Sequence, residues 1–228
     1  QAFRYQPGRI SGFTFGVRMK TPGERSSDVI EWGAANETDE YIFQLRGIDW
    51  TIIRRSTIPL RKELLERQGL DETDQRLVYP TQLKNDEEIQ RDGNNSGTHW
   101  ETKIPRDKWN GDNLLGGGRS GYTITFENVT MYKIEFSWYG AIGAKFYAYV
   151  PVDSGECRWV LLHTFVIENG MDYPVLKNPD LKFKYLLYNT DTEFVTSPSF
   201  IYKYGSSYYI DGGDEGTVGV VTLRPMLK

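Results

Sequence analysis

Apolar residues recur at every second position along much of this chain, and this period restricts its fold more than any other feature. Between residues 132 and 138, Tyr132, Ile134 and Phe136 fall on one side of an extended chain, and Lys133 and Glu135 fall on the other. Such alternation is typical of a β-strand with one buried face. It predicts strands at 13–19, 29–32, 41–46, 49–54, 122–126, 132–138, 143–150, 181–187, 199–204, 207–210 and 217–223.

The run from Arg158 to Ile167 is apolar on both sides, and this pattern predicts a central strand. Turn signals such as Asp153-Ser154-Gly155 separate the strand candidates. Many short antiparallel strands joined by Gly-rich turns are typical of two packed sheets. The sequence therefore predicts an all-β fold, an antiparallel β-sandwich of a jelly-roll-like kind.

One segment departs from the period of two and predicts a short helix near 59–68. Pro59 stands close to its first turn, and Leu60, Leu64 and Leu65 share one face of a helix. The remaining face is charged, which is typical of a helix surface in contact with water.

A polar excursion near 70–98 follows the helix and contains few aromatic residues. We interpret it as an excursion within a single domain that covers 1–228, and not as a linker, because Leu77-Val78-Tyr79 and Trp100 are suited to docking on the rest of the fold. The first residues already resemble interior sequence, so we expect the chain to be an ordered part of a longer one.

The composition excludes several classes of protein. The 31 acidic and 27 basic residues give a formal net charge of −4, which disfavours nucleic acid as a partner because phosphate contacts need an excess of Lys and Arg. A single Cys excludes a disulfide framework. The sequence contains no run of about 18 apolar residues, so we expect no membrane span.

Few residues are suited to nucleophilic or metal chemistry. His99 and His163 are far apart in the sequence and belong to no metal-binding motif, so we expect both to be structural. Cys157 has no neighbouring His and begins a strand candidate, which predicts a buried, inert thiol. The sequence predicts no catalytic residue, no bound metal and no cofactor.

Two loops and three short motifs leave alternatives open. The Gly-rich segment 116–121 lacks the Lys of a phosphate-binding loop, which predicts a tight turn. The acidic segment 211–216 is more typical of a hairpin loop, with a calcium site as the alternative. Asn36, Asn94 and Asn128 match the glycosylation acceptor pattern, which would suit a secreted adhesion domain.

Aromatic residues make up 14% of the chain, and exposed Trp and Tyr on a β-sheet can stack on sugar rings. Most of them stand at alternating positions, where burial in a core explains them. We treat four as exceptions and as candidate glycan contacts: Trp32, Trp50, Tyr208 and Tyr209.

The middle of the chain contains three short motifs. They are W-N-x-D (Trp109, Asn110, Asp112), G-x-G-x-S-G (Gly116, Gly118, Ser120, Gly121) and a longer-spaced form of W-x-G-x-G (Trp138, Gly140, Gly143). With the F-R-Y-Q-P-G-R start at 3–9 and a His-x-Phe stretch at 163–169, they resemble a module of large virion structural proteins of marine tailed bacteriophages, cyanophages among them. The resemblance covers roughly residues 3–190.

The resemblance implies a non-catalytic part of a virus particle: a fibre, tail, baseplate or capsid-decorating component. Such a chain would reside in the virion, assemble with other virion proteins and form a homo-oligomer, most often a trimer. Trp109 would then anchor a turn and Trp138 would fill the core. A glycan on the host surface is a further expected partner.

The residues alone leave a second function open. A carbohydrate-binding module or a polysaccharide depolymerase also fits a β-sandwich. The first would bind glycans through exposed aromatic side chains, and the second would need a pair of essential carboxylates.

Overall fold

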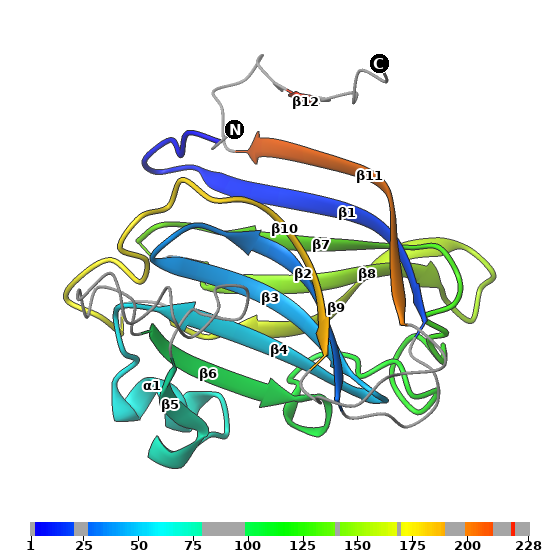
Figure 1. Cartoon of the computed structure of the whole chain (residues 1–228), viewed down its shortest axis with the longest axis horizontal. Coiled ribbons are helices and arrows are strands. Elements are labelled where there is room, and N and C mark those ends of the chain that lie inside the picture. The colour runs from blue at the N-terminus through cyan, green and yellow to red at the C-terminus, as the bar shows by residue number, and fades with distance from the viewer. Residues whose placement is uncertain are drawn as a thin grey trace.

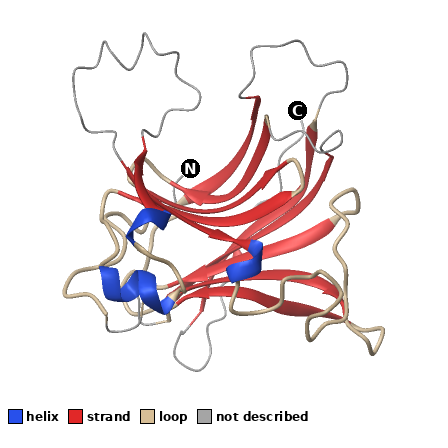
Figure 2. Cartoon of the chain, turned by 90° about the horizontal axis from the view of Figure 1, so that it is seen from below, coloured by secondary structure: helices blue, strands red, loops and turns tan. Residues whose placement is uncertain are grey.

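The alternating segments form two antiparallel sheets, each of six strands in the part of the chain that the structure describes. Figure 1 shows the sheets one behind the other, and Figure 2 shows them from below as two curved layers. The predicted β-sandwich is confirmed. The computed structural model describes residues 3–20, 27–78, 99–139, 142–167, 170–189 and 199–211, and the backbone of 220–221.

The first sheet, sheet A, contains both early and late parts of the chain. Its strand order is β12-β11-β1-β7-β8-β9, so that β1 lies between β11 and β7. The strands are β1 (Ile10–Lys20), β7 (Thr130–Phe136), β8 (Ala144–Pro151), β9 (Cys157–Phe165), β11 (Phe200–Asp211) and β12 (Val220–Val221).

The second sheet, sheet B, has the order β10-β2-β3-β4-β6-β5 and lies in front in Figure 1. Its strands are β2 (Asp28–Ala35), β3 (Asp39–Arg46), β4 (Asp49–Ser56), β5 (Gln75–Val78), β6 (His99–Pro105) and β10 (Lys182–Asn189). Three short helical elements accompany the described strands: α1 (Lys62–Arg67), η1 (Glu72–Asp74) and η2 (Arg106–Lys108).

Aromatic rings from both sheets meet between the two layers. Trp32 of β2 stacks on Phe43 of β3 with ring centres 5.3 Å apart, and it also meets Tyr132 of β7 at 5.1 Å. Trp50 of β4 lies 5.8 Å from the same Tyr132 ring. All four side chains are buried. This cluster joins the layers because it buries large apolar surfaces from each sheet.

The short helix predicted near 59–68 is present as α1, which is shorter because the chain is extended up to Arg61. Leu60, Leu64 and Leu65 are buried, as their shared face indicated. Gly69 follows the helix with φ +71°, a conformation that Gly adopts without strain.

The polar excursion predicted near 70–98 lies only partly within the described residues. Its beginning forms η1 and β5, and β5 pairs with β6, a strand that the sequence did not predict. The sequence of β6, His99–Pro105, lacks a clear apolar alternation, because its buried positions include Glu101 and Thr102 as well as Ile104. Residues 79–98 lie outside the described part of the chain.

Three other strand predictions need correction. Residues 122–126 form no strand and contribute only a bridge between Leu115 and Thr123. The segment 158–167, predicted as central, forms β9 at the end of sheet A, where the main chain of a loop binds the open edge of the strand. The predictions 199–204 and 207–210 belong to one strand, β11.

Truncation of a central ring should lower stability strongly. We expect Trp32→Ala to reduce the free energy of unfolding by about 3–5 kcal/mol, because it leaves a cavity between the sheets. Urea unfolding followed by fluorescence measures this loss. Ile48→Ala, in the exposed turn between β3 and β4, is the control and should change stability by less than about 0.5 kcal/mol. Equal effects of the two substitutions would contradict the prediction.

Candidate functional site

The W-N-x-D motif fixes a loop to sheet edges through main-chain contacts. The indole Nε1 of Trp109 donates to the carbonyl oxygen of Ile104 (3.0 Å), and its ring meets Trp50 edge-on at 4.7 Å. Asn110 makes two hydrogen bonds with the main chain of Thr164 in β9, one in each direction and each 2.8 Å long. The first two residues of the motif therefore connect η2 to both sheets.

Asp112 holds the Gly-rich loop in shape. Its buried carboxylate accepts hydrogen bonds from the N–H groups of Leu114 (2.8 Å) and Ser120 (2.7 Å). Gly118 packs so closely against this carboxylate that an added Cβ would overlap it. The carboxylate is thus bound to the main chain, and charge-assisted hydrogen bonds of this kind are stronger than neutral ones.

The segment 116–121 contains the turn that the sequence predicts. The N–H of Gly121 donates to the carbonyl oxygen of Gly118 (3.1 Å), which closes the turn. Gly116 and Gly121 have φ values of +83° and +64°, a region that residues with a Cβ rarely adopt. The glycines of this motif are explained by backbone conformation and close packing.

Trp138 links the third motif to the N-terminal segment. Its indole Nε1 donates to the carbonyl oxygen of Leu176 (2.8 Å), and its main-chain N–H donates to the hydroxyl of Tyr5 (2.9 Å). Gly143 has φ +66°, and a Cβ there would overlap a carbonyl oxygen of β9. Gly140 lies outside the described residues. Tyr5, within the start of the resembling region, therefore contacts the third motif directly.

The candidate glycan contacts are mostly inaccessible. Trp32, Trp50 and Tyr208 are buried, so the expectation that they are exposed is wrong. Their positions follow the alternation of the core, and Trp32 stands between buried Ile30 and Ala34 in β2. Tyr209 is half-buried, and its hydroxyl donates to a Glu135 carboxylate oxygen.

The residues suited to nucleophilic or metal chemistry have structural surroundings. His163 is buried, its Nδ1 accepts a hydrogen bond from the N–H of Asn110 (3.2 Å), and burial lowers its pKa to about 3. His99 is also buried. Cys157 is exposed, so its predicted burial is wrong: it is the first residue of β9, before that strand enters the core. Among the described residues, no group of three or more His, Cys, Asp or Glu could hold a metal ion.

The acidic segment 211–216 is described only at its first residue. Asp211 is the last residue of β11, and its main chain pairs with Ile10 of β1. Residues 212–216 lie outside the described part of the chain, so the choice between a hairpin loop and a calcium site stays a prediction.

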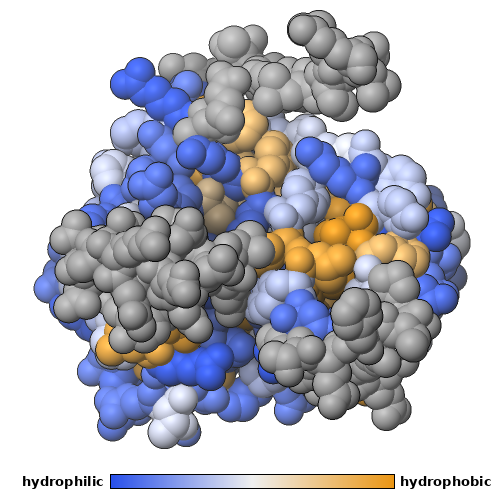
Figure 3. All heavy atoms as spheres, viewed as in Figure 1, coloured by the Kyte–Doolittle hydropathy of each residue, from blue (hydrophilic) through white to orange (hydrophobic). Residues whose placement is uncertain are grey.

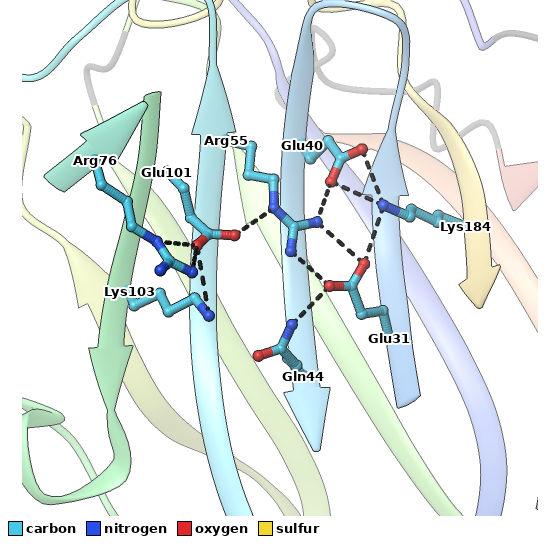
Figure 4. A network of polar contacts seen from close by, with 8 residues as sticks. All are labelled: Glu31, Glu40, Gln44, Arg55, Arg76, Glu101, Lys103 and Lys184. Atoms are coloured by element: carbon cyan, nitrogen blue, oxygen red, sulfur yellow. Dashed lines mark hydrogen bonds and ion pairs between the residues drawn. The ribbon is translucent and has the colours of Figure 1, made fainter. Parts of the chain in front are cut away.

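Figure 4 shows a charge network on the outward face of sheet B, which the sequence did not predict. Arg55 of β4 stands at its centre, with Nε 2.7 Å from Glu101 of β6 and Nη1 2.7 Å from Glu40 of β3. Its guanidinium also binds Glu31 of β2. Every strand of sheet B contributes a side chain to the network, which consists of Glu31, Glu40, Gln44, Arg55, Arg76, Glu101, Lys103 and Lys184.

The network lowers the pKa values of Glu31 and Glu101. Burial alone would raise the pKa of Glu31, but the charges and hydrogen bonds of Arg55 and Lys184 lower it to about 2. The pKa of Glu101 is lowered for the same kind of reason, against the opposing effect of burial. Burial, with a contribution from Glu31, raises the pKa of the neighbouring Tyr188 to about 12. These groups are suited to ion pairing and not to proton transfer near neutral pH.

No model of a known protein family and no curated protein matches this chain. Within the described ranges, none of the helices has the length and hydropathy needed to cross a lipid bilayer. A proposal about function therefore rests on the geometry of the three motifs and of the charge network.

The close contact of Gly118 with Asp112 generates a prediction about the loop. We expect Gly118→Ala to lower the free energy of unfolding by about 1–3 kcal/mol, because the new methyl group displaces a carboxylate that two N–H groups hold in place. Thermal and urea unfolding measure the effect. Gly117→Ala is the matched control, since a Cβ there meets no atom within 4 Å. If both variants are as stable as the wild type, the carboxylate is not held as described.

The lowered pKa of Glu31 predicts a pH-dependent contribution to stability. Its charged form stabilises the fold fully above about pH 4.5, and this contribution is lost as the pH falls towards 2. We expect Glu31→Gln to lower the free energy of unfolding by about 3 kcal/mol at pH 7, and by progressively less from pH 4.5 to 2.

Urea unfolding at a series of pH values measures the difference between wild type and E31Q. Glu66→Gln, on the exposed side of α1, is the control and should differ from wild type by less than about 0.5 kcal/mol at every pH. A difference between wild type and E31Q that stays constant down to pH 2 would show that the ion pairs of Glu31 are not responsible.

Proposed function

We propose that this chain is a non-catalytic structural component of a tailed-phage particle, in a fibre, tail, baseplate or capsid-decorating position. The observation that carries the proposal is the use of the motif side chains. Trp109, Asn110 and Asp112 bind main-chain atoms of their own loop and of neighbouring strands. These residues belong to the motifs that resemble the virion module, and their contacts hold the loop in place.

The charge network supports a structural role over a depolymerase. Hydrolysis of a glycosidic bond needs a carboxyl group that is still protonated near neutral pH, and such groups have raised pKa values. Glu31 and Glu101 have lowered pKa values, and both bind Arg55. Their arrangement favours cross-linking of the strands of sheet B.

An exposed part of the inner face of sheet B supports assembly with another chain. On β10, Phe183 and Tyr185 pack against the core, whereas Leu187 on the same face is 39% exposed. Figure 3 shows hydrophobic atoms gathered between β10 and β11, and an exposed apolar patch of this kind is typical of a protein–protein contact. Burial of this patch would stabilise an oligomer, for which we propose a trimer.

The oligomer can be tested with two matched substitutions. We expect Leu187→Glu to convert the oligomer to monomers, because a charge would be buried in the contact, and light scattering with native mass spectrometry measures the mass. Leu77→Glu is the control: Leu77 is also exposed, but it lies on β5 at the opposite end of sheet B, so the oligomer should persist. A wild-type chain that stays monomeric at high concentration would contradict the proposed assembly.

The place in the particle needs a separate experiment. An antibody raised against the purified chain should label intact phage particles at one repeated position in electron micrographs, and mass spectrometry of purified particles should detect the chain. Absence of the chain from purified particles would refute the virion role. The oligomer measurement does not depend on this result, since it uses the purified chain.

A further inference from the structure

A cleft of about 620 Å³ lies between the Gly-rich loop and the beginning of β9. This volume falls within the range of small-molecule sites, roughly 300–1,000 Å³. The main chain of Gly117 and Gly118 forms part of one wall, and Arg158 to Leu161 form the other. Its lining residues are Asn110, Gly111, Asp112, Gly117, Gly118, Arg119, Ser120, Val152, Arg158, Trp159, Val160 and Leu161.

The walls of this cleft are fixed in place by the loop contacts. The N–H groups of Gly111 and Asp112 donate to the carbonyl oxygens of Leu162 (3.0 Å) and Leu161 (2.9 Å) on the open edge of β9. The Asp112 carboxylate then holds Ser120 on the loop side. A cleft with both walls anchored in this way keeps its shape without a ligand, which lowers the entropic cost of binding.

Two arginines, one on each wall, give the cleft an affinity for anions. Arg119 on the loop and Arg158 on β9 are both exposed. Arg158 binds Glu156 at 2.7 Å, but both side chains are more than 60% exposed, and exposed pairs of this kind contribute little energy. Asp112, the acidic residue of the lining, is already bound by two N–H groups. A planar guanidinium matches a carboxylate or a sulfate group through two parallel hydrogen bonds.

An aromatic side chain completes the site. Trp159 is half-buried and lines the cleft from β9. Its ring is held by Tyr149, whose ring centre is 5.2 Å away, and by the Nζ of Lys133, which lies 4.9 Å from the ring centre. An indole held in one orientation offers an apolar face to the C–H side of a sugar ring and an N–H to its hydroxyl groups.

We propose that this cleft binds a saccharide that carries a carboxylate or a sulfate group. Arg119 and Arg158 bind the anionic group from the two walls, and Trp159 packs against the sugar ring. The site is distinct from the four aromatic residues that the sequence indicated. It does not depend on the proposed particle role, because binding is a property of the purified chain.

Calorimetric titration of the full chain with three oligosaccharides of equal length tests the site. The probes are an oligouronate, which carries carboxylates, a sulfated oligosaccharide, and neutral cellohexaose. We expect binding of one or both acidic probes and none of cellohexaose. The preference between the two acidic probes identifies the anionic group. No binding of either acidic probe, or equal binding of cellohexaose, would overturn the proposal.

Three substitutions and one control assign the binding to the cleft. Arg119→Ala and Arg158→Ala should each weaken binding at least about tenfold, since hydrogen bonds to charged groups are lost. Arg119→Lys keeps the positive charge but cannot form the two parallel hydrogen bonds of a guanidinium, so it should also weaken binding. Arg4→Ala removes an exposed arginine outside the cleft and should bind like the wild type. Equal weakening by Arg4→Ala and Arg119→Ala would mean that only overall charge attracts the probe, and the proposal would fail.

Discussion

The structure depends most on the contacts of Trp50 in the middle of the sandwich. Its ring lies 5.8 Å from Tyr132 of the opposite sheet and 4.7 Å from Trp109 at the start of the motif loop. The guanidinium carbon of Arg106 lies 5.4 Å from the centre of the same ring. One side chain therefore joins the two sheets and connects them to the loop. Core packing and loop geometry are consequently coupled, because interiors are too densely packed for one to shift without the other.

Much of the core could be predicted from the period of two. In a strand with one solvent-exposed face, the alternation of apolar and polar residues shows which side chains point into the core. The same period also indicates the burial of Trp32, which stands between buried Ile30 and Ala34. Strand β6 was missed because buried Glu101 and Thr102 interrupt its apolar pattern. A hydropathy pattern assigns a charged residue to the surface, and only knowledge of its ion-pair partner indicates that it is buried.

The charge network depends on register, which a single sequence does not contain. Glu40, Arg55 and Glu101 occupy directly opposite positions across β3, β4 and β6, and Arg76 of β5 continues the row. A shift of one strand by a single residue would turn these side chains towards the core. Such a shift would leave buried charges without their partners, which is costly, so the observed register is the one that the ion pairs favour. The Gly-rich loop differs, because the carboxylate of Asp112 binds the N–H groups of Leu114 and Ser120, which are close to it in the sequence.

The loop that binds the edge of β9 has a consequence for how copies of this chain can meet. An open strand edge is a template for strands of other molecules, and natural sheets cover or distort such edges. At Leu161 and Leu162 the outward carbonyl groups of β9 already accept hydrogen bonds from Gly111 and Asp112. Sheet A therefore cannot be extended through this part of β9 by a foreign strand. At high local concentration, as within a growing assembly, this stretch is protected from the uncontrolled sheet growth that leads to fibrils.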